Sequence, residues 1–324
     1  MIKVIGPRGD RQTDESGAVS RAWNHQSVRA NGVQLHFVRE GNGEPLIFLH
    51  GWPGFWYDWS ENLPVLGEHF DCIAPDMRGF GYSEKPSLPP EVGYNDGSMA
   101  ADILEFLNEL GLARASLVAH DFGALWAQRF ARSHAERVAR LVLFNPPYLG
   151  IGQRWREPQH GPHFWHQYFH ALDWTHKLIE AGRENVELYV SYFLNAWCHP
   201  SFKFRPEVLA EYIEACSQPG AIQHGFDVFR AAFRGGNQIV LPEEKIIALP
   251  TLILWGEDDP CVPIRWADRL GEFFANYSFL KIPRCGHYPM REKPEIVHDH
   301  ILRFFKKKPA PEAEVDAPVA DPQN

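Results

Sequence analysis

The chain has 324 residues, of which 44% are hydrophobic and 23% charged, and its formal net charge is −9. This is the composition of a globular protein, and a mildly acidic chain without a basic stripe argues against a nucleic-acid partner. No apolar run is long enough to span a membrane, so the sequence predicts a soluble protein without a membrane partner. The five cysteines form no Cys-x-x-Cys pair, which predicts free thiols and a cytoplasmic location.

Apolar runs bounded by turn residues predict a series of strands. Residues 33–38 alternate apolar and polar side chains, which is typical of a half-exposed edge strand. A continuous apolar run at 45–49 is typical of a strand buried on both faces of a parallel sheet. Further strands are predicted at 71–74, 115–119, 140–144, 251–255 and 278–282.

Helical patterns separate most of these strands. Ser98 can cap a helix that ends at Gly111, another helix follows residue 121, and the last runs from 294 to about 306. Strands that alternate with helices predict an α/β fold with a mostly parallel, doubly wound sheet.

The alternation stops between about 149 and 245, where helical patterning and many aromatic residues predict an inserted helical cap. We therefore expect four parts: a flexible lead-in over 1–25, a core of 26–148 and 246–308, a helical cap over 149–245, and a disordered tail over 309–324.

The stretch 117–124 carries the strongest chemical signal. An apolar run leads into a small-x-Asp-x-Gly turn and then a helix, which is the pattern of a nucleophile elbow with Asp121 at its tip. Ala119 and Gly123 flank the tip because larger side chains would clash in so sharp a turn. Asp121 is therefore the candidate nucleophile.

Three further motifs complete a candidate active site. Asp259 follows the strand at 251–255 in a Gly-x-x-Asp loop, and His287 lies on a loop after the last strand, so that nucleophile, acid and base occur in the order of an α/β-hydrolase triad. The spacing favours Asp259 over Asp258 as the acid, and Asn145 is a weak alternative because an amide cannot stabilise an imidazolium as a carboxylate does. Residues 50–54, His-Gly-Trp-Pro-Gly, follow an apolar strand where an oxyanion loop belongs.

With these motifs, residues 28–306 resemble the α/β-hydrolase family. The stretches HGWPGFWYDW at 50–59 and APDMRGFGYSEKP at 74–86 are similar to the epoxide hydrolase branch and its haloacetate dehalogenase relatives. The resemblance implies that Asp121 forms an alkyl-enzyme ester, which water activated by His287 then hydrolyses. It also implies an oxyanion hole made by the backbone N–H groups of Trp52 and Phe122, and no cofactor or metal.

Epoxide hydrolases of this branch use two cap tyrosines to protonate the epoxide oxygen. The first position falls near Trp165 and His166, so His166 is the candidate ligand of the leaving group, with Tyr168 as a second donor. The second position falls on Val228 and Phe229, neither of which can donate a hydrogen bond.

The same resemblance leaves the leaving group open. Apolar Phe122 and Leu125 occupy the positions where fluoroacetate-type dehalogenases carry arginines, which disfavours an anionic haloacid and predicts a small, neutral, hydrophobic substrate with water as co-substrate. The leading hypothesis is an epoxide hydrolase-like enzyme. The alternatives are a dehalogenase that releases halide from a neutral organohalide or haloacid and binds it through His166 or the indole of Trp52 or Trp165, and a non-catalytic binding protein on a hydrolase scaffold. A homodimer is left open.

Overall fold

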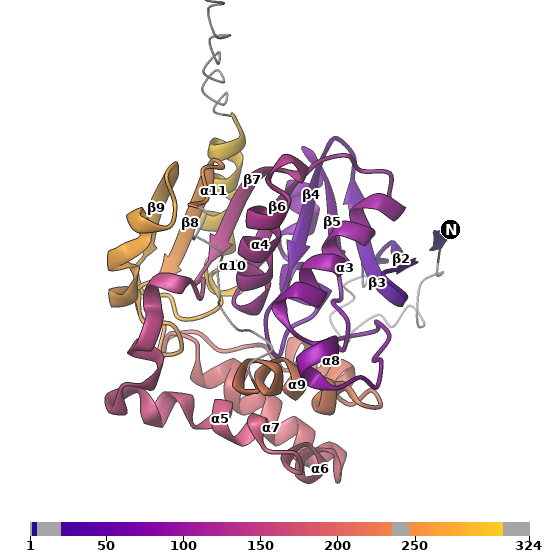
Figure 1. Ribbon diagram of the computed structural model, residues 1–324, viewed down its shortest axis with the longest axis vertical. Helices are drawn as coiled ribbons and strands as arrows, with labels where there is room; N and C mark the ends of the chain where they lie inside the picture. Colours follow the sequence, from indigo (N-terminus) through magenta and orange to yellow (C-terminus); the bar gives the residue numbers. More distant parts are fainter. Residues whose placement is uncertain (1, 5–20, 235–245, 307–324) are drawn as a thin grey trace, which may run out of the picture.

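The computed structural model describes residues 2–4, 21–234 and 246–306. Within these residues, nine strands form one sheet in the order β1-β2-β3-β5-β4-β6-β7-β8-β9 (Figure 1). The strands are β1 Lys3–Val4, β2 His25–Ala30, β3 Val33–Gly41, β4 Glu44–Leu49, β5 Phe70–Pro75, β6 Ala115–His120, β7 Val138–Phe144, β8 Thr251–Gly256 and β9 Tyr277–Ile282.

The sheet is parallel from β5 through β9 and antiparallel at the β1–β3 side. The predicted doubly wound α/β sheet is therefore confirmed. The expected edge position of residues 33–38 is corrected, because β2 pairs with β3 on its outer side. His36 of β3 is buried and hydrogen-bonds to His25 and Asp76, so its polar side chain does not mark a solvent-facing surface.

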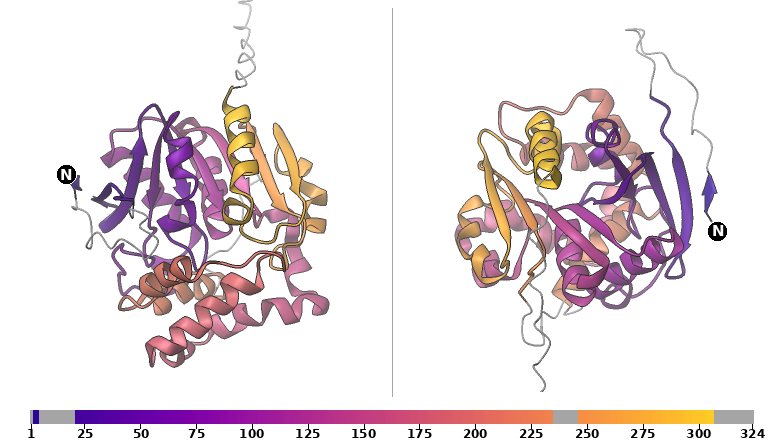
Figure 2. Two further views of the ribbon diagram at one scale, coloured as in Figure 1. Left: turned by 180° about the vertical axis from the view of Figure 1, so that it is seen from behind. Right: turned by 90° about the horizontal axis from the view of Figure 1, so that it is seen from above.

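Two helices cover one face of the sheet and another covers the opposite face. The helices are α1 Leu63–Leu66, α2 Pro90–Gly93, α3 Asp96–Glu109, α4 Phe122–Ser133, α5 Gly161–Ala171, α6 Thr175–Glu180, α7 Arg183–Ala196, α8 Pro206–Cys216, α9 Ala221–Phe233, α10 Pro289–Glu292 and α11 Pro294–Lys306. The described ranges also contain the 3₁₀ segments η1 Trp56–Trp59, η2 Ala135–Arg137, η3 Leu149–Arg156, η4 Pro158–His160 and η5 Ile264–Glu272. Helices α3 and α4 lie on one face and α11 on the other (Figure 1, Figure 2). No described helix combines the length and the apolar character that crossing a membrane requires.

Helices α5 to α9, which we call the cap helices, follow β7 and gather at one end of the sheet (Figure 1). In the segment expected to be a flexible lead-in, the two residues of β1 pair with β2, and β2 itself begins at His25. The tail expected at 309–324 lies outside the described residues.

The start of α3 differs from the expectation. The side chain of Asn95, not Ser98, caps the helix, because the Asn95 side-chain oxygen accepts the backbone N–H of Ser98 at 3.0 Å. The helix gives way to Gly111, which has a φ of 69° as predicted for a residue that ends a helix.

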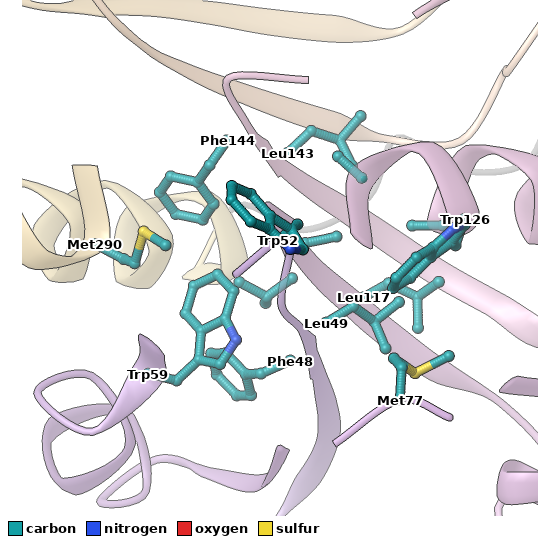
Figure 3. Packing of buried hydrophobic residues seen from close by; sticks show 14 of the residues in the cluster. Phe48, Leu49, Trp52, Trp59, Met77, Leu117, Trp126, Leu143, Phe144 and Met290 are labelled. Atoms are coloured by element: carbon teal, nitrogen blue, oxygen red, sulfur yellow. The ribbon is translucent and has the colours of Figure 1, made fainter. Parts of the chain in front are cut away.

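The register of the sheet places the candidate motifs side by side. Leu49 at the end of β4 pairs with Ala119 of β6, so the loop after β4 begins beside the turn that carries Asp121. Trp59 of η1 packs its ring against Phe48 of β4 and Phe144 of β7, with ring centroids 5.3 and 5.7 Å apart (Figure 3). This packing holds the loop that follows β4 against the ends of the strands.

Candidate active site

The tip of the turn between β6 and α4 is Asp121, with φ 50° and ψ −121°. A non-glycine residue with positive φ is strained and persists because its surroundings hold it there. A Cβ on Gly123 would lie 2.5 Å from the carbonyl oxygens of His50 and Leu49, and a Cβ on Gly51 would lie 2.5 Å from Cβ of Asp121. Glycine at both positions therefore lets the turn and the loop after β4 approach each other.

Asp259 and His287, the predicted acid and base, contact each other next to Asp121. The Nδ1 of His287 donates a hydrogen bond to Oδ2 of Asp259 at 2.8 Å, and Nε2 of His287 lies 3.6 Å from Oδ2 of Asp121. The backbone N–H groups of Cys261 and Val262 donate to Oδ1 of Asp259 at 2.7 and 3.0 Å, which fixes the carboxylate. The side chain of Asp258 is 47% exposed and lies near His199 instead, so Asp259 is the carboxylate that contacts the histidine.

Asn145 is a functional candidate that sequence reasoning treated only as a weak alternative acid. Its Nδ2 donates to Oδ2 of Asp259 at 2.5 Å, and its Oδ1 accepts the backbone N–H of Gly256 at 3.3 Å. The residue is buried and has a φ of 43°. Asn145 thus holds the Asp259 carboxylate in place. In the sequence it is a polar residue directly after strand β7, and β7 is the neighbour of β8, the strand that leads into the Asp259 loop.

The two backbone N–H groups predicted to form the oxyanion hole lie beside the carboxylate of the nucleophile. The backbone N–H of Trp52 donates to Oδ1 of Asp121 at 3.2 Å, and the backbone N–H of Phe122 helps to lower the pKa of this carboxylate. The loop that carries Trp52 is fixed by His50, whose Nδ1 donates to the carbonyl of Gly51 and whose Nε2 accepts the N–H of Met77.

The negative charge of Asp121 and the positive charge of His287 stabilise each other. Burial opposes charge on both side chains. The adjacent imidazolium of His287, whose Nε2 lies 3.6 Å from the carboxylate, outweighs burial and lowers the pKa of Asp121. Likewise, Asp259 and Asp121 together outweigh burial and raise the pKa of His287 to about 10. The resting site therefore holds an ionised carboxylate beside an imidazolium.

A cavity of about 210 Å³ opens above Asp121, between the core and the cap helices. Its walls are mostly apolar and include Phe122, Leu125, Trp197 and Phe229. Phe229 of α9 packs against Phe122 with ring centroids 4.9 Å apart. The position expected for a second cap tyrosine is thus filled by a ring that cannot donate a hydrogen bond.

Of the three residues of α5 that were predicted to bind the leaving group, only His166 lines the cavity. His166 is 1% exposed and lines the cavity, whereas Trp165 and Tyr168 are 39% and 57% exposed and do not line it. Successive helical residues are rotated by about 100°, and in α5 this places Gln167 beside His166 at the cavity but leaves Trp165 and Tyr168 outside it. The expected ligand roles of Trp165 and Tyr168 are corrected accordingly.

The indole of Trp52, proposed above as a halide ligand, is packed against the cap. Its Nε1 lies 3.4 Å from the position that a Cβ on Gly225 of α9 would take. Nε1 therefore lies beside α9, which makes Trp52 a weaker candidate for binding a leaving group.

Comparison with known proteins agrees with this geometry. A family model described as alpha/beta hydrolase fold matches residues 44–294. The soluble epoxide hydrolase of Corynebacterium sp. (strain C12) is 33% identical over 87% of this chain and 96% of its own length. The structure of the epoxide hydrolase CorEH without ligand has a TM-score of 0.76 at 30% identity, and covers 87% of this chain and 98% of that one.

A second solved structure, Bacillus megaterium epoxide hydrolase in complex with an inhibitor, has a TM-score of 0.76 at 25% identity, and covers 87% of this chain and 100% of that one. The family match includes every residue of the site described above, and the relatives extend over most of the chain. The chain therefore belongs to the α/β-hydrolase fold family, in its epoxide hydrolase branch, and is an enzyme.

Proposed function

We propose that this enzyme hydrolyses neutral, apolar epoxides through an ester formed on Asp121. The observation that carries the proposal is the carboxylate of Asp121 in an apolar cavity, with one oxygen on the N–H of Trp52 and the other 3.6 Å from His287. A carboxylate is a poor nucleophile for acyl transfer, but it can displace a leaving group at an sp³ carbon.

In the first half-reaction, an oxygen of Asp121 attacks a ring carbon of the epoxide. The carbon–oxygen bond of the ring breaks, its electron pair goes to the ring oxygen, and the new bond makes an alkyl ester of Asp121. The ring oxygen takes up one proton. The apolar walls contributed by Phe122 and Leu125 favour a neutral substrate, because an anionic group would be buried there without a partner.

In the second half-reaction, His287 acts as the base. The ester carries no charge, so one of the two carboxylates that raise the pKa of His287 is removed and the imidazolium can release its proton. That release balances the proton that the ring oxygen takes up. Neutral His287 then activates a water, which attacks the ester carbonyl and restores the Asp121 carboxylate with a diol as product.

The backbone N–H groups of Trp52 and Phe122 support the same step. The Trp52 N–H already donates to the carboxyl group of Asp121, on which the oxyanion of ester hydrolysis would form, and the Phe122 N–H helps to lower the pKa of that group. A donor of this kind contributes about 3–4 kcal/mol to transition-state stabilisation in other hydrolases.

The relatives favour an epoxide over an organohalide as substrate. The similar proteins from Corynebacterium and Bacillus megaterium are named epoxide hydrolases. A dehalogenase remains the competing reaction because the same ester chemistry expels a halide.

The test uses the His287→Gln variant, which should form the ester but not hydrolyse it. The variant is incubated with styrene oxide and, separately, with 1-bromohexane, and the intact protein is weighed. We expect an increase by the full mass of the epoxide, which is absent when Asp121→Asn is also present. An alkyl adduct with halide release would indicate a dehalogenase instead. No adduct from either class, with an inert wild type, would reject the ester mechanism.

A further inference from the structure

His166 has a nitrogen atom in the cavity that lacks a hydrogen-bond partner. The residue lies on α5, is 1% exposed and lines the same cavity as Asp121. The imidazole stacks over Trp52 and also contacts Trp197 and Phe229, with ring centroids 6.2, 5.1 and 5.8 Å apart. In the described part of the chain, its Nδ1 is hydrogen-bonded and its Nε2 is not.

The position of the imidazole proton follows from the bond at Nδ1. That nitrogen lies 3.0 Å from the backbone carbonyl oxygen of His163. A carbonyl oxygen can only accept a hydrogen bond, so the proton must be on Nδ1 of His166. Burial lowers the pKa of His166 to about 3, which keeps the ring neutral at working pH. A neutral imidazole has one N–H, so Nε2 is a bare acceptor.

A bare acceptor cannot perform the role that the family resemblance implies for this position. Binding a halide or protonating a ring oxygen requires a donor, and His166 would first have to move its proton away from the carbonyl of His163. Nε2 of His166 does not belong to the fully enclosed unpaired side-chain atoms of the described residues, so it is open to the cavity and available to a ligand. A ligand with an O–H or N–H group would satisfy it.

We propose that Nε2 of His166 accepts a hydrogen bond from a hydroxyl group of the substrate, so that the preferred substrates are epoxides with a hydroxyl close to the ring. This inference rests on the proposed epoxide chemistry and names its substrate class. A cationic N–H donor does not fit, because it would pair with the carboxylate of Asp121 in the same small cavity and hinder its attack.

The chain offers a matched control on the same helix. His170 is also buried and packs on Trp52, with ring centroids 4.6 Å apart. Its Nε2 is already hydrogen-bonded to the hydroxyl of Tyr189 at 2.7 Å, and the residue does not line the cavity. Replacement of His170 perturbs the cap packing without removing an acceptor from the cavity.

The experiment compares three epoxides that differ at one group: 3-phenylglycidol, its O-methyl ether, and 1-phenylpropylene oxide, which lacks the oxygen. The value of kcat/KM is measured for each with wild type and with His166→Phe, His166→Gln and His170→Phe. We expect wild type to favour the alcohol by roughly 3- to 10-fold, the range of one net hydrogen bond. The preference should disappear in His166→Phe, and persist in His170→Phe and in His166→Gln, which keeps an acceptor oxygen.

Two results would overturn the inference. One is equal use of the three epoxides by wild type, or a preference that survives in His166→Phe. The other is a preference for the ether as strong as that for the alcohol, because an ether oxygen accepts hydrogen bonds and would reveal a proton on Nε2. ¹⁵N chemical shifts of the wild-type histidines test the tautomer directly, without relying on the folding of any variant.

The same substrates separate this inference from the proposed function. If His287→Gln is alkylated by all three epoxides but wild type shows no hydroxyl preference, the ester chemistry stands and the role of His166 is rejected. If none of the three alkylates His287→Gln, the proposed function itself fails.

Discussion

Asn145 links Asp259, the acid of the site, to the backbone at the end of β8. Its amide donates to the carboxylate of Asp259, and its carbonyl oxygen accepts from Gly256 at the end of β8. Asp259 in turn orients His287. The side chain of Asn145 does not line the cavity, so it acts on the reaction through Asp259 and is a positioning residue.

We therefore predict that Asn145→Ala slows ester hydrolysis more than ester formation. The loss of one donor leaves an oxygen of a buried carboxylate less well paired, which typically costs about 1–3 kcal/mol, or roughly tenfold in rate per 1.4 kcal/mol. Rapid-quench measurements should show accumulation of the ester, with its hydrolysis slowed about tenfold.

Asn62→Ala is the matched control for this prediction. Asn62 is also fully buried and its Nδ2 donates to the carbonyl oxygen of Met290 at 3.0 Å, outside the triad. Its replacement should lower stability by a similar amount without accumulation of the ester. Equal slowing of both steps in Asn145→Ala would show that the residue is merely structural.

At the scale of the element, the turn from β6 into α4 depends on backbone contact with the end of β4. The nearest neighbours of a Cβ on Gly123 are backbone atoms of Leu49 and His50, which cannot rotate away as a side chain can. A larger residue must therefore push the elbow and the oxyanion loop apart.

We predict that Gly123→Ala lowers the free energy of unfolding by about 1–3 kcal/mol, the usual range for overpacking, and lowers kcat at least tenfold. Urea unfolding and steady-state kinetics measure the two effects. Gly161→Ala in α5 is the control, since a Cβ there meets nothing within 4 Å and the position has no positive φ. Wild-type activity in Gly123→Ala would contradict the proposed close approach.

The sequence was sufficient for the elements whose burial is continuous. Strands β4 to β8 were predicted within two residues at either end, because most of their positions are buried. Strand β9 was predicted equally closely, although only Ile282 of it is buried. Strand β2, with the sequence HQSVRA, was missed. Its polar residues are buried because His25 hydrogen-bonds to His36, which in turn pairs with Asp76, and such a network depends on residues far apart in the chain.

The triad was predictable for a different reason than the cap. Asp121, Asp259 and His287 each follow a predicted strand, and parallel strands bring their carboxyl ends together. The side chains on α5 have no such constraint. Whether His166 or Tyr168 faces the cavity depends on the rotation of the helix against Phe229 and Trp197, which no local pattern specifies.

At the scale of the whole molecule, a buried polar contact joins a cap helix to the core. The hydroxyl of Tyr212 on α8 donates to Oδ1 of Asp58 in η1 at 2.6 Å. Within the described residues, Oδ2 of Asp58 has no hydrogen-bond partner. Burial raises the pKa of Asp58 to about 7, although the Tyr212 hydrogen bond opposes this shift.

The sign of the resulting pH dependence follows from proton binding. Asp58 is a carboxylic acid with a pKa near 4 when unfolded and about 7 when folded, so between these values the folded state binds more protons. Stability is therefore unaffected below about pH 4 and falls as the pH rises through about 7. The full loss corresponds to at most about 4 kcal/mol, since each pKa unit is worth 1.36 kcal/mol.

Asp58→Asn should remove this loss, because an amide of the same shape can still accept from Tyr212 but carries no charge. We predict that the variant gains about 4 kcal/mol of stability relative to wild type at about pH 8 and less than half of that at about pH 5, because the loss in wild type is complete only above about pH 7. Urea unfolding at both pH values measures the difference, with Asp173→Asn at an exposed carboxylate as the control. The same difference at both pH values would mean that Asp58 is ionised in the folded protein throughout, and that its link to the cap does not depend on a proton.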